Sequence, residues 1–225
     1  MKYEIIGGNL PVVEVALDAN ESMICEAGAM SWMSNHLTMS TSGGGLGKMF
    51  SKAFSGESMF RNTYTAEGKP GMIAFASSVP GSIVAVELNN NAIIAQKGAF
   101  LAATSGIDTQ IAFQSKAKTG IFGGEGFIMQ KIFGTGTVFL EIDGSTVIKE
   151  LAAGEKITVD TGYVAYMSET CKMEAVGVAG MKNKLLGGEG LFNTVITGPG
   201  KVALQTMPIS QLAGRIAAFI PTSGS

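Results

Sequence analysis

The sequence predicts an all-β protein built from three fused homologous modules around a pseudo-threefold axis, with a C-terminal α-helix. Three observations lead to this fold class. A hexapeptide that contains glycine and glutamate recurs three times along the 225 residues. Each copy is followed by a glycine turn and by apolar residues at every second position, which is the period of a half-buried strand. The C-terminal segment changes to the spacing of an amphipathic helix.

The repeated hexapeptides are SGESMF at 55–60, GGEGFI at 123–128 and GGEGLF at 187–192. Their glutamates lie 68 residues (125 − 57) and 64 residues (189 − 125) apart. A leucine and two further glycines keep the same order around each copy: Leu17, Gly28 and Gly71, then Leu88, Gly98 and Gly136, then Leu151, Gly162 and Gly200. This shared frame predicts internal repeats at approximately 1–80, 81–144 and 145–207, within one compact body that spans 1–225.

Apolar residues two and four positions after the last glycine of each repeat predict a strand face in the core. They are Ile73 and Phe75, Val138 and Leu140, and Val202 and Leu204. A period of 64 to 68 residues is longer than that of common solenoid repeats, and it has room for several short strands with turns. We expect the three units to close around the pseudo-threefold axis, because closure buries their apolar faces together and removes exposed sheet edges.

Two segments depart from the strand pattern. In GLGKMFSKAFSG (45–56), apolar residues at helical spacing predict a short helix over 46–54. The C-terminal MPISQLAGRIAAFIP predicts a helix over 208–220, with Pro208 and Ser210 as start signals. Its apolar stripe is formed by Ile209, Leu212, Ile216 and Phe219. We expect this stripe to cap the β body.

Composition excludes several classes of function. The net charge is −2 and charged residues make up 15% of the chain, whereas nucleic-acid binding needs clustered Lys and Arg. No apolar stretch is long enough to span a bilayer. The N-terminal MKYEIIGGNLPVVEVAL has neither the apolar core of a signal peptide nor the Arg and Ser bias of a transit peptide. We therefore expect a cytoplasmic protein, with attachment to a membrane surface as the alternative.

The triplicated hexapeptide, the GxG turn before an apolar strand and the terminal P-I-S-Q-L-A helix resemble the altered-inheritance-of-mitochondria family of mitochondrial biogenesis. The likeness covers nearly the whole chain, and without a presequence the chain is similar to the bacterial branch of uncharacterised proteins. The resemblance implies three modules similar to that of the tryptophan attenuation protein, each a short, barrel-like double-stranded β-helix. The fungal member is mitochondrial and associated with inner-membrane organisation. The resemblance implies no catalytic residues.

Residues for catalysis or metal binding are scarce. His36 is the only histidine, so neither a nucleophile with a histidine base nor a multi-histidine metal site is indicated. We interpret it as an exposed turn residue. Cys25 and Cys171, the only cysteines, lie in apolar strand-like runs and are interpreted as buried free thiols. We predict no cofactor, no metal and no enzymatic activity.

The repeated glutamates Glu57, Glu125 and Glu189 are the first candidate site. If they face the axis, three carboxylates could bind a cation that prefers oxygen ligands. If they face turns, each carboxylate accepts hydrogen bonds from glycine N–H groups and fixes its loop. Crowded carboxylates repel one another and raise their pKa values, which favours the turn-bracing interpretation.

An apolar patch with neighbouring lysines is the second candidate site. Apolar residues precede each hexapeptide, and the pseudo-threefold symmetry would gather them at one end of the molecule. The set comprises Leu46, Lys48, Met49, Phe50, Lys52, Phe54, Ile121, Phe122, Leu185 and Leu186. Such a patch could rest on an anionic membrane or dock a protein. Alternatively, the same residues plug the end of the β body.

These features together favour a non-enzymatic binding or scaffold protein. Its partner would be an unknown protein or an anionic membrane surface, and formation of a homo-oligomer stays open. A small-ligand-binding protein that uses clefts between the modules is the alternative. Binding of RNA is not expected from the charge balance and the 8% aromatic content.

Overall fold

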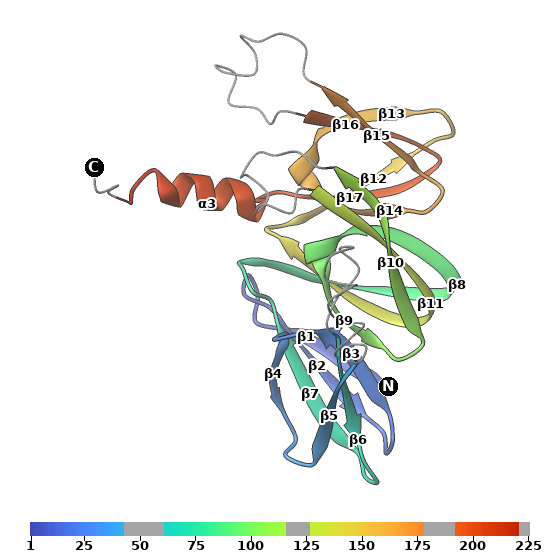
Figure 1. Ribbon diagram of the computed structural model, residues 1–225, viewed down its shortest axis with the longest axis vertical. Helices are drawn as coiled ribbons and strands as arrows, with labels where there is room; N and C mark the ends of the chain where they lie inside the picture. The colour runs from blue at the N-terminus through green and yellow to red at the C-terminus, as the bar shows by residue number, and fades with distance from the viewer. Residues whose placement is uncertain (43–60, 116–126, 178–191, 221–225) are drawn as a thin grey trace, which may run out of the picture.

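The protein folds into antiparallel β-sheets followed by one C-terminal helix, as a computed structural model shows (Figure 1). The structure describes residues 1–42, 61–115, 127–177 and 192–220. The predicted all-β class and the predicted C-terminal helix are therefore confirmed. The helix predicted over 46–54 lies outside the described residues.

The strands form three consecutive groups, which Figure 1 shows stacked along the longest axis of the molecule. The N-terminal group contains β1 (Lys2–Ile6), β2 (Val12–Leu17), β3 (Ser22–Glu26), β4 (Met30–Met33), β5 (Leu37–Ser42), β6 (Arg61–Ala66) and β7 (Gly71–Ala76). The central group contains β8 (Gly81–Gln96), β9 (Phe100–Thr104), β10 (Ile107–Ser115) and β11 (Phe127–Asp143). The C-terminal group contains β12 (Thr146–Leu151), β13 (Lys156–Asp160), β14 (Val164–Ser168), β15 (Lys172–Gly177), β16 (Phe192–Thr197) and β17 (Gly200–Gln205). Helix α3 (Ile209–Ala217) follows, and short 3₁₀ turns at Lys97–Ala99 and Thr161–Tyr163 precede β9 and β14.

One pairing pattern recurs in the three groups. In the N-terminal group, β6 pairs with β3 and β5, while β7 pairs with β2 and β4. In the C-terminal group, β16 pairs with β13 and β15, while β17 pairs with β12 and β14. The central group follows the same plan with longer strands, because β11 pairs with β8 along its length, with β10 through its first part and with β9 near its end.

Two further strand pairs join the groups into one large sheet. Strand β3 pairs with β9, and β8 pairs with β14. The large sheet runs β12-β17-β14-β8-β11-β9-β3-β6-β5, with β10 beside β11. The smaller sheets are β1-β2-β7-β4 and β13-β16-β15. Closure around a pseudo-threefold axis would need a third junction, between β13 and β4, and no such pair is found among the described strands.

Three apolar clusters hold these sheets together. Five of the six residues predicted on the core face have 0% exposure, namely Ile73, Phe75, Val138, Leu140 and Val202. The sixth, Leu204, is half-buried and packs against the edge of the third cluster. Neighbouring groups share their clusters, because Phe139 of the central group belongs to the same cluster as Phe75 of the N-terminal group. The ring of Phe139 also meets that of Tyr3 edge-on, with centroids 5.0 Å apart. Full burial of such a side chain contributes about 1.5–3 kcal/mol to folding.

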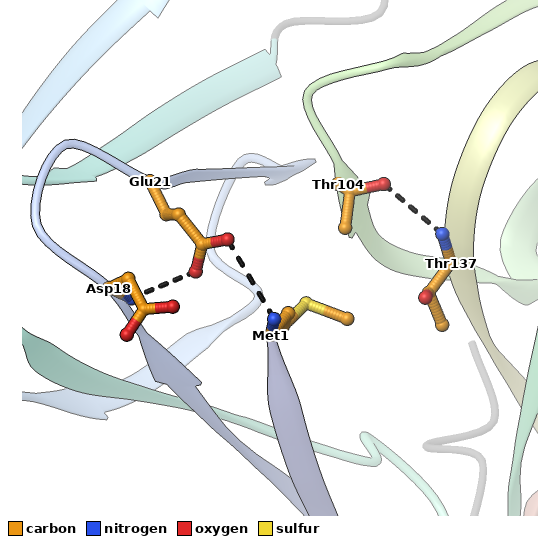
Figure 2. A network of polar contacts seen from close by, with 5 residues as sticks. All are labelled: Met1, Asp18, Glu21, Thr104 and Thr137. Atoms are coloured by element: carbon orange, nitrogen blue, oxygen red, sulfur yellow. Dashed lines mark hydrogen bonds and ion pairs between the residues drawn. The ribbon is translucent and has the colours of Figure 1, made fainter.

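In each group, a hydroxyl group accepts a hydrogen bond from the residue that follows the last glycine of the repeat. The N–H groups of Met72, Thr137 and Lys201 donate to the hydroxyl oxygens of Ser34, Thr104 and Ser168, at 3.0, 3.1 and 3.0 Å. Figure 2 shows the bond between Thr137 and Thr104. At Gly136, where φ is 145°, an added Cβ would lie 1.9 Å from Thr104 Oγ1. Glycine therefore allows the hydroxyl to approach the backbone.

A side-chain oxygen also braces the same turn in each group. Glu21 accepts a hydrogen bond from the N–H of Asp18 at 2.8 Å, and its other oxygen lies 3.8 Å from the amino group of Met1 (Figure 2). Glu155 and Asn91 make the equivalent bonds, accepting from the N–H groups of Ala152 and Asn89 at 2.8 Å. These braces lie in the turns after Leu17, Leu88 and Leu151, whereas the turns predicted to be braced by Glu57, Glu125 and Glu189 lie outside the described residues.

Helix α3 does not cap the β body. None of its residues is buried, and Figure 1 shows it extending away from the strands. Its first residue is attached to the body, because the N–H of Ile209 donates to Asp143 Oδ2 at 2.7 Å. The prediction of a capping helix was wrong. Apolar residues at helical spacing identify the apolar face of a helix, but they do not determine which surface packs against that face.

Candidate functional site

A pocket of about 320 Å³ opens where the strand groups meet. All three groups and the first residue of α3 contribute to its lining: Glu26, Ser78, Val79, Gln96, Gly98, Ala99, Glu141, Asp143, Gln205 and Ile209. This volume is at the lower end of the range for small-molecule sites. The pocket is therefore the candidate site that the described residues provide.

Strand ends place the polar side chains around the pocket. Glu26, Gln96 and Gln205 are the last residues of β3, β8 and β17, three strands that take part in or lie beside the two junctions. Glu141 and Asp143 lie two residues apart at the end of β11, so both side chains point to one face of the sheet. The site depends on the approach of separate groups, because no single group supplies the whole lining.

The carboxylate of Glu141 is bonded to the connection between β7 and β8. It accepts hydrogen bonds from the N–H of Ser78 at 2.8 Å and from the hydroxyl of Ser77 at 3.1 Å. The hydroxyl of Ser78 lies 3.0 and 3.1 Å from its two oxygens. These bonds hold the carboxylate beside the pocket in one orientation.

The carboxyl of Asp143 lies between the body and α3. Burial raises its pKa, the hydrogen bond from the N–H of Ile209 lowers it, and the nearby charge of Glu141 raises it, with a net increase above the ordinary value. The bond to Ile209 also places a negative group at the start of α3, where the helix dipole favours it. Asp143 thus connects the pocket to the orientation of the helix.

Gln205 joins the C-terminal group to the central group at the pocket wall. Its amide nitrogen donates to Gly162 O at 2.8 Å and to Gln96 Oε1 at 3.2 Å. Its amide oxygen accepts from the N–H of Asp143 at 3.2 Å. The side chain is buried and its hydrogen bonds are internal, so we assign Gln205 a structural role in shaping the pocket.

Three carboxyl groups, those of Glu26, Glu141 and Asp143, give the lining of the pocket an acidic character. Its carboxylates could accept charge-assisted hydrogen bonds from an ammonium or another donor group. No histidine, cysteine or lysine is among the described residues that line it. In the part of the chain that the structure describes, no set of three or more His, Cys, Asp or Glu residues is arranged to hold a metal ion.

Both sites predicted from the sequence lie outside the described residues. This applies to the glutamates Glu57, Glu125 and Glu189 and to the apolar patch of Leu46, Lys48, Met49, Phe50, Lys52, Phe54, Ile121, Phe122, Leu185 and Leu186. Their placement therefore stays a prediction.

The histidine and the two cysteines are described. His36 lies in a turn, as predicted, but it is half-buried, so the prediction that it is exposed was wrong. Its Nε2 has no hydrogen-bond partner among the described atoms. It lies against Gly71, whose missing side chain leaves room for the imidazole. Cys25 and Cys171 are confirmed as buried free thiols. Burial, with a smaller effect of Glu26, raises the pKa of Cys25 to about 12, and burial raises the pKa of Cys171.

Sequence reasoning missed the pocket residues, although the repeat frame contains a signal for two of them. The fifth residue after the last glycine of each repeat is Ala76, Glu141 or Gln205. Polar residues replace alanine in two of the three copies, and both of them line the pocket. Asp143 has no comparable signal, because its role depends on where α3 begins.

The fold defines an all-β protein in which antiparallel strand groups are joined edge to edge. The chain belongs to the mitochondrial biogenesis AIM24 family, whose model matches residues 3–207. The family predicted from the repeated hexapeptides is thereby confirmed.

Two bacterial proteins illustrate the relationship. The chain is 31% identical over 226 residues to an uncharacterised protein of Streptococcus pyogenes serotype M6, with 96% of this chain and 89% of the relative covered. It also resembles a crystal structure of a protein from Streptococcus pyogenes, with a TM-score of 0.81 and 26% identity over 97% of this chain and 99% of that chain. Within the described ranges, α3 is too short to cross a bilayer, and no other helix there is long and apolar enough.

Proposed function

We propose that this protein is a non-enzymatic binding or scaffold protein that holds a protein partner against the apolar face of α3. The observation that carries the proposal is the exposure of large apolar side chains on this helix and just beyond it. Ile209, Ile216 and Ile220 are exposed, and Phe219 is 87% exposed. Covering each of them with a partner would contribute roughly 1.5–3 kcal/mol.

The composition of α3 favours a protein over an anionic membrane as its partner. Arg215 is the only basic residue between Ile209 and Ala217. Attraction to anionic lipid contributes about 1 kcal/mol for each nearby Lys or Arg, so the helix gains little from charge. A cytoplasmic location, with attachment to membranes through the bound partner, belongs to this proposal. The predicted apolar patch around 46–54 is a second docking surface within it.

Recovery of a specific partner tests this function. The untagged protein would be purified from its own cells after chemical crosslinking, and bound proteins identified by mass spectrometry. We expect one partner with the wild type that is lost with Ile216→Ser/Phe219→Ser. The matched control is Val147→Ser/Ile148→Ser, which alters exposed apolar residues of β12 and should retain the partner.

Flotation with anionic vesicles separates the membrane alternative from the protein partner. The wild type would be compared with Phe50→Ser/Phe54→Ser and with Ile216→Ser/Phe219→Ser. Equal flotation of the three proteins would exclude binding to an anionic membrane. Recovery of the same partner with all variants would contradict the role of α3.

We further propose that the strand groups are three fused homologous modules, each a short double-stranded β-helix similar to that of the tryptophan attenuation protein, with repeats at 1–80, 81–144 and 145–207. The recurring pairing pattern, hydroxyl bond and turn brace support this. A one-residue bulge also recurs, because Ser31, Leu101 and Ala165 are skipped in the pairing of β4, β9 and β14. Rotations of about a third of a circle between modules would establish the pseudo-threefold axis, and an experimental structure with other rotations would exclude it.

A small-ligand-binding protein is the second candidate function, and the pocket at the junctions favours it. Its ligand would carry a positive charge or several donor groups, to match Glu26, Glu141 and Asp143. Native mass spectrometry of the untagged protein would reveal a retained small molecule. We expect that molecule to raise the melting temperature of the wild type more than that of Glu141→Gln. An equal increase would place its site elsewhere.

A further inference from the structure

The two junctions between strand groups have the same register. The first pairs Met23 with Thr104, Ile24 with Ala103 and Cys25 with Ala102; the second pairs Ile93 with Ser168, Ile94 with Met167 and Ala95 with Tyr166. In both junctions, the three paired residues of the first strand lie five, four and three positions before the glycine of the repeat frame that follows them. That glycine is Gly28 at the first junction and Gly98 at the second (28 − 23 and 98 − 93 are both 5). The three paired residues of the second strand lie six, five and four positions after the glycine of the repeat frame that precedes them. That glycine is Gly98 at the first junction and Gly162 at the second (104 − 98 and 168 − 162 are both 6). The junction is therefore a defined, repeated interface.

Strands β4 and β13 hold the same positions in the repeat, but they are not joined. Strand β4 corresponds to β9 and β14, and among the described strands it pairs with β7 alone. Strand β13 corresponds to β3 and to the end of β8, and among the same strands it pairs with β16 alone. Figure 1 shows β4 in the lower group and β13 in the upper group, with the central group between them. We call these two strands the open edges.

Three other unpaired edges do not have this property. Strands β5 and β15 end their sheets, and the corresponding β10 is likewise an outer strand of the central group. These three edges are equivalent and none of them is paired across a junction. The open edges differ from these three. The strands equivalent to β4 and β13 in the other groups pair across a junction, β9 with β3 and β14 with β8. The fold itself thus shows which partner fits them.

Exposure of side chains agrees with a missing partner. Trp32 on β4 is 44% exposed, whereas the equivalent Ala102 at the first junction is 0% exposed. Met33 is half-buried, while its counterparts Ala103 and Met167 are buried. On β13, Thr158 is exposed, although the equivalent Ile24 at the first junction is half-buried.

We propose that β13 of one copy pairs with β4 of a second copy of this chain and repeats the internal junction between molecules. The expected antiparallel register is Ile157 with Ser34, Thr158 with Met33 and Val159 with Trp32. The four-stranded sheet β1-β2-β7-β4 and the three-stranded sheet β13-β16-β15 then become one continuous sheet across the interface. Because the two surfaces differ, the contact is head-to-tail and generates either a closed ring or a filament.

The sole tryptophan provides a test on the unmodified protein. Trp32 would become covered by β13 of the next copy, so its fluorescence should shift to longer wavelength on dilution as assemblies dissociate. Native mass spectrometry of the same samples should show multiples of the 23.3 kDa chain. A monomer at all concentrations, with unchanged Trp32 emission, would overturn the proposal.

Engineered disulfides test the register. The variant Met33→Cys/Thr158→Cys should form a ladder of disulfide-linked oligomers on mild oxidation, because the two positions face each other across the contact. The native Cys25 and Cys171 are buried and should add little background. The matched control is Ile148→Cys/Thr158→Cys, in which the partner cysteine lies on exposed β12 and should crosslink poorly. Equal ladders in the two variants, or none in the first, would contradict the proposed register.

A charged substitution on the open edge gives a separate readout. Thr158→Asp should weaken self-association by about tenfold or more, because the contact would bury a carboxylate without a partner. Thr158 is exposed in the single chain, so the fold should be retained, as circular dichroism would verify. Val176→Asp, on the opposite edge of the same sheet, is the control and should assemble normally. Assembly of Thr158→Asp at wild-type strength would overturn the role of β13.

Discussion

The strand body and α3 both carry apolar stripes, but only the strand body buries them. Phe139 on β11 is 0% exposed, while Phe219 just beyond α3 is 87% exposed. Apolar strand faces meet one another within and between groups, whereas α3 is attached at its start and extends outward (Figure 1). Apolar spacing therefore identifies a face that is stabilised by burial, and the surrounding structure decides whether this protein itself buries that face.

The largest expected difference between the two regions is in the cost of removing a phenylalanine. Phe139→Ala should lower the free energy of unfolding by about 3–5 kcal/mol, because it leaves a cavity in the shared core. Phe219→Ala should change it by less than about 0.5 kcal/mol, because its ring is exposed. Urea denaturation of both variants measures this. Similar losses would show that the helix region packs on the body.

Two glycines sharpen the same comparison. Gly136→Ala should cost roughly 2–4 kcal/mol, because φ is unfavourable for alanine and the new methyl group would collide with Thr104. Gly214 in α3 has open space around it, so Gly214→Ala should stabilise the helix by about 0.5–1 kcal/mol. Thermal unfolding followed by circular dichroism gives both values. A destabilising Gly214→Ala would mean that α3 has a close neighbour.

The pH dependence of stability should report the buried thiol of the body. Because the pKa of Cys25 rises from 9.0 to about 12 on folding, the folded state keeps its proton where the unfolded chain loses it. This contribution to stability is complete below pH 9 and should decline as the pH rises from about 9 toward 12. Cys25→Ala should flatten that decline in denaturation experiments. Parallel curves for the two proteins would exclude it.

Asp143, where body and helix meet, should show the smallest effect. Its pKa is raised in the folded state, so the folded protein favours the protonated carboxyl and loses stability as the pH rises from the unfolded pKa through the raised value. Asp143→Asn removes this loss and still offers an oxygen to the N–H of Ile209. We expect the variant to gain stability relative to the wild type between acidic and neutral pH. A pH-independent difference would contradict this.

Much of the strand pattern could be predicted from the sequence. Alternating residues such as Ile73 and Val138 were assigned to the core and are buried. The repeat frame also located equivalent glycines: Gly136 and Gly200 each precede a residue whose N–H donates to a hydroxyl oxygen. Local periodicity is informative here because side chains alternate between the two faces of any strand.

The candidate site could be predicted only in part. Clefts between modules were the expected place for a ligand, yet Glu141 and Asp143 were not singled out. Their significance comes from the approach of the 77–80 connection and of α3, both distant from them in sequence. Long-range contacts of this kind leave little trace in a single sequence.

The order of the amino acids is enough to predict which residues alternate between faces, where the chain turns and that one pattern occurs three times. Tertiary structure alone decided that the groups meet through β3 with β9 and β8 with β14, that carboxylates gather at those junctions, and that α3 projects from the body. The physical reason is that strand periodicity is a local property of the backbone. Which edge or face receives a partner depends instead on every other surface competing to cover it.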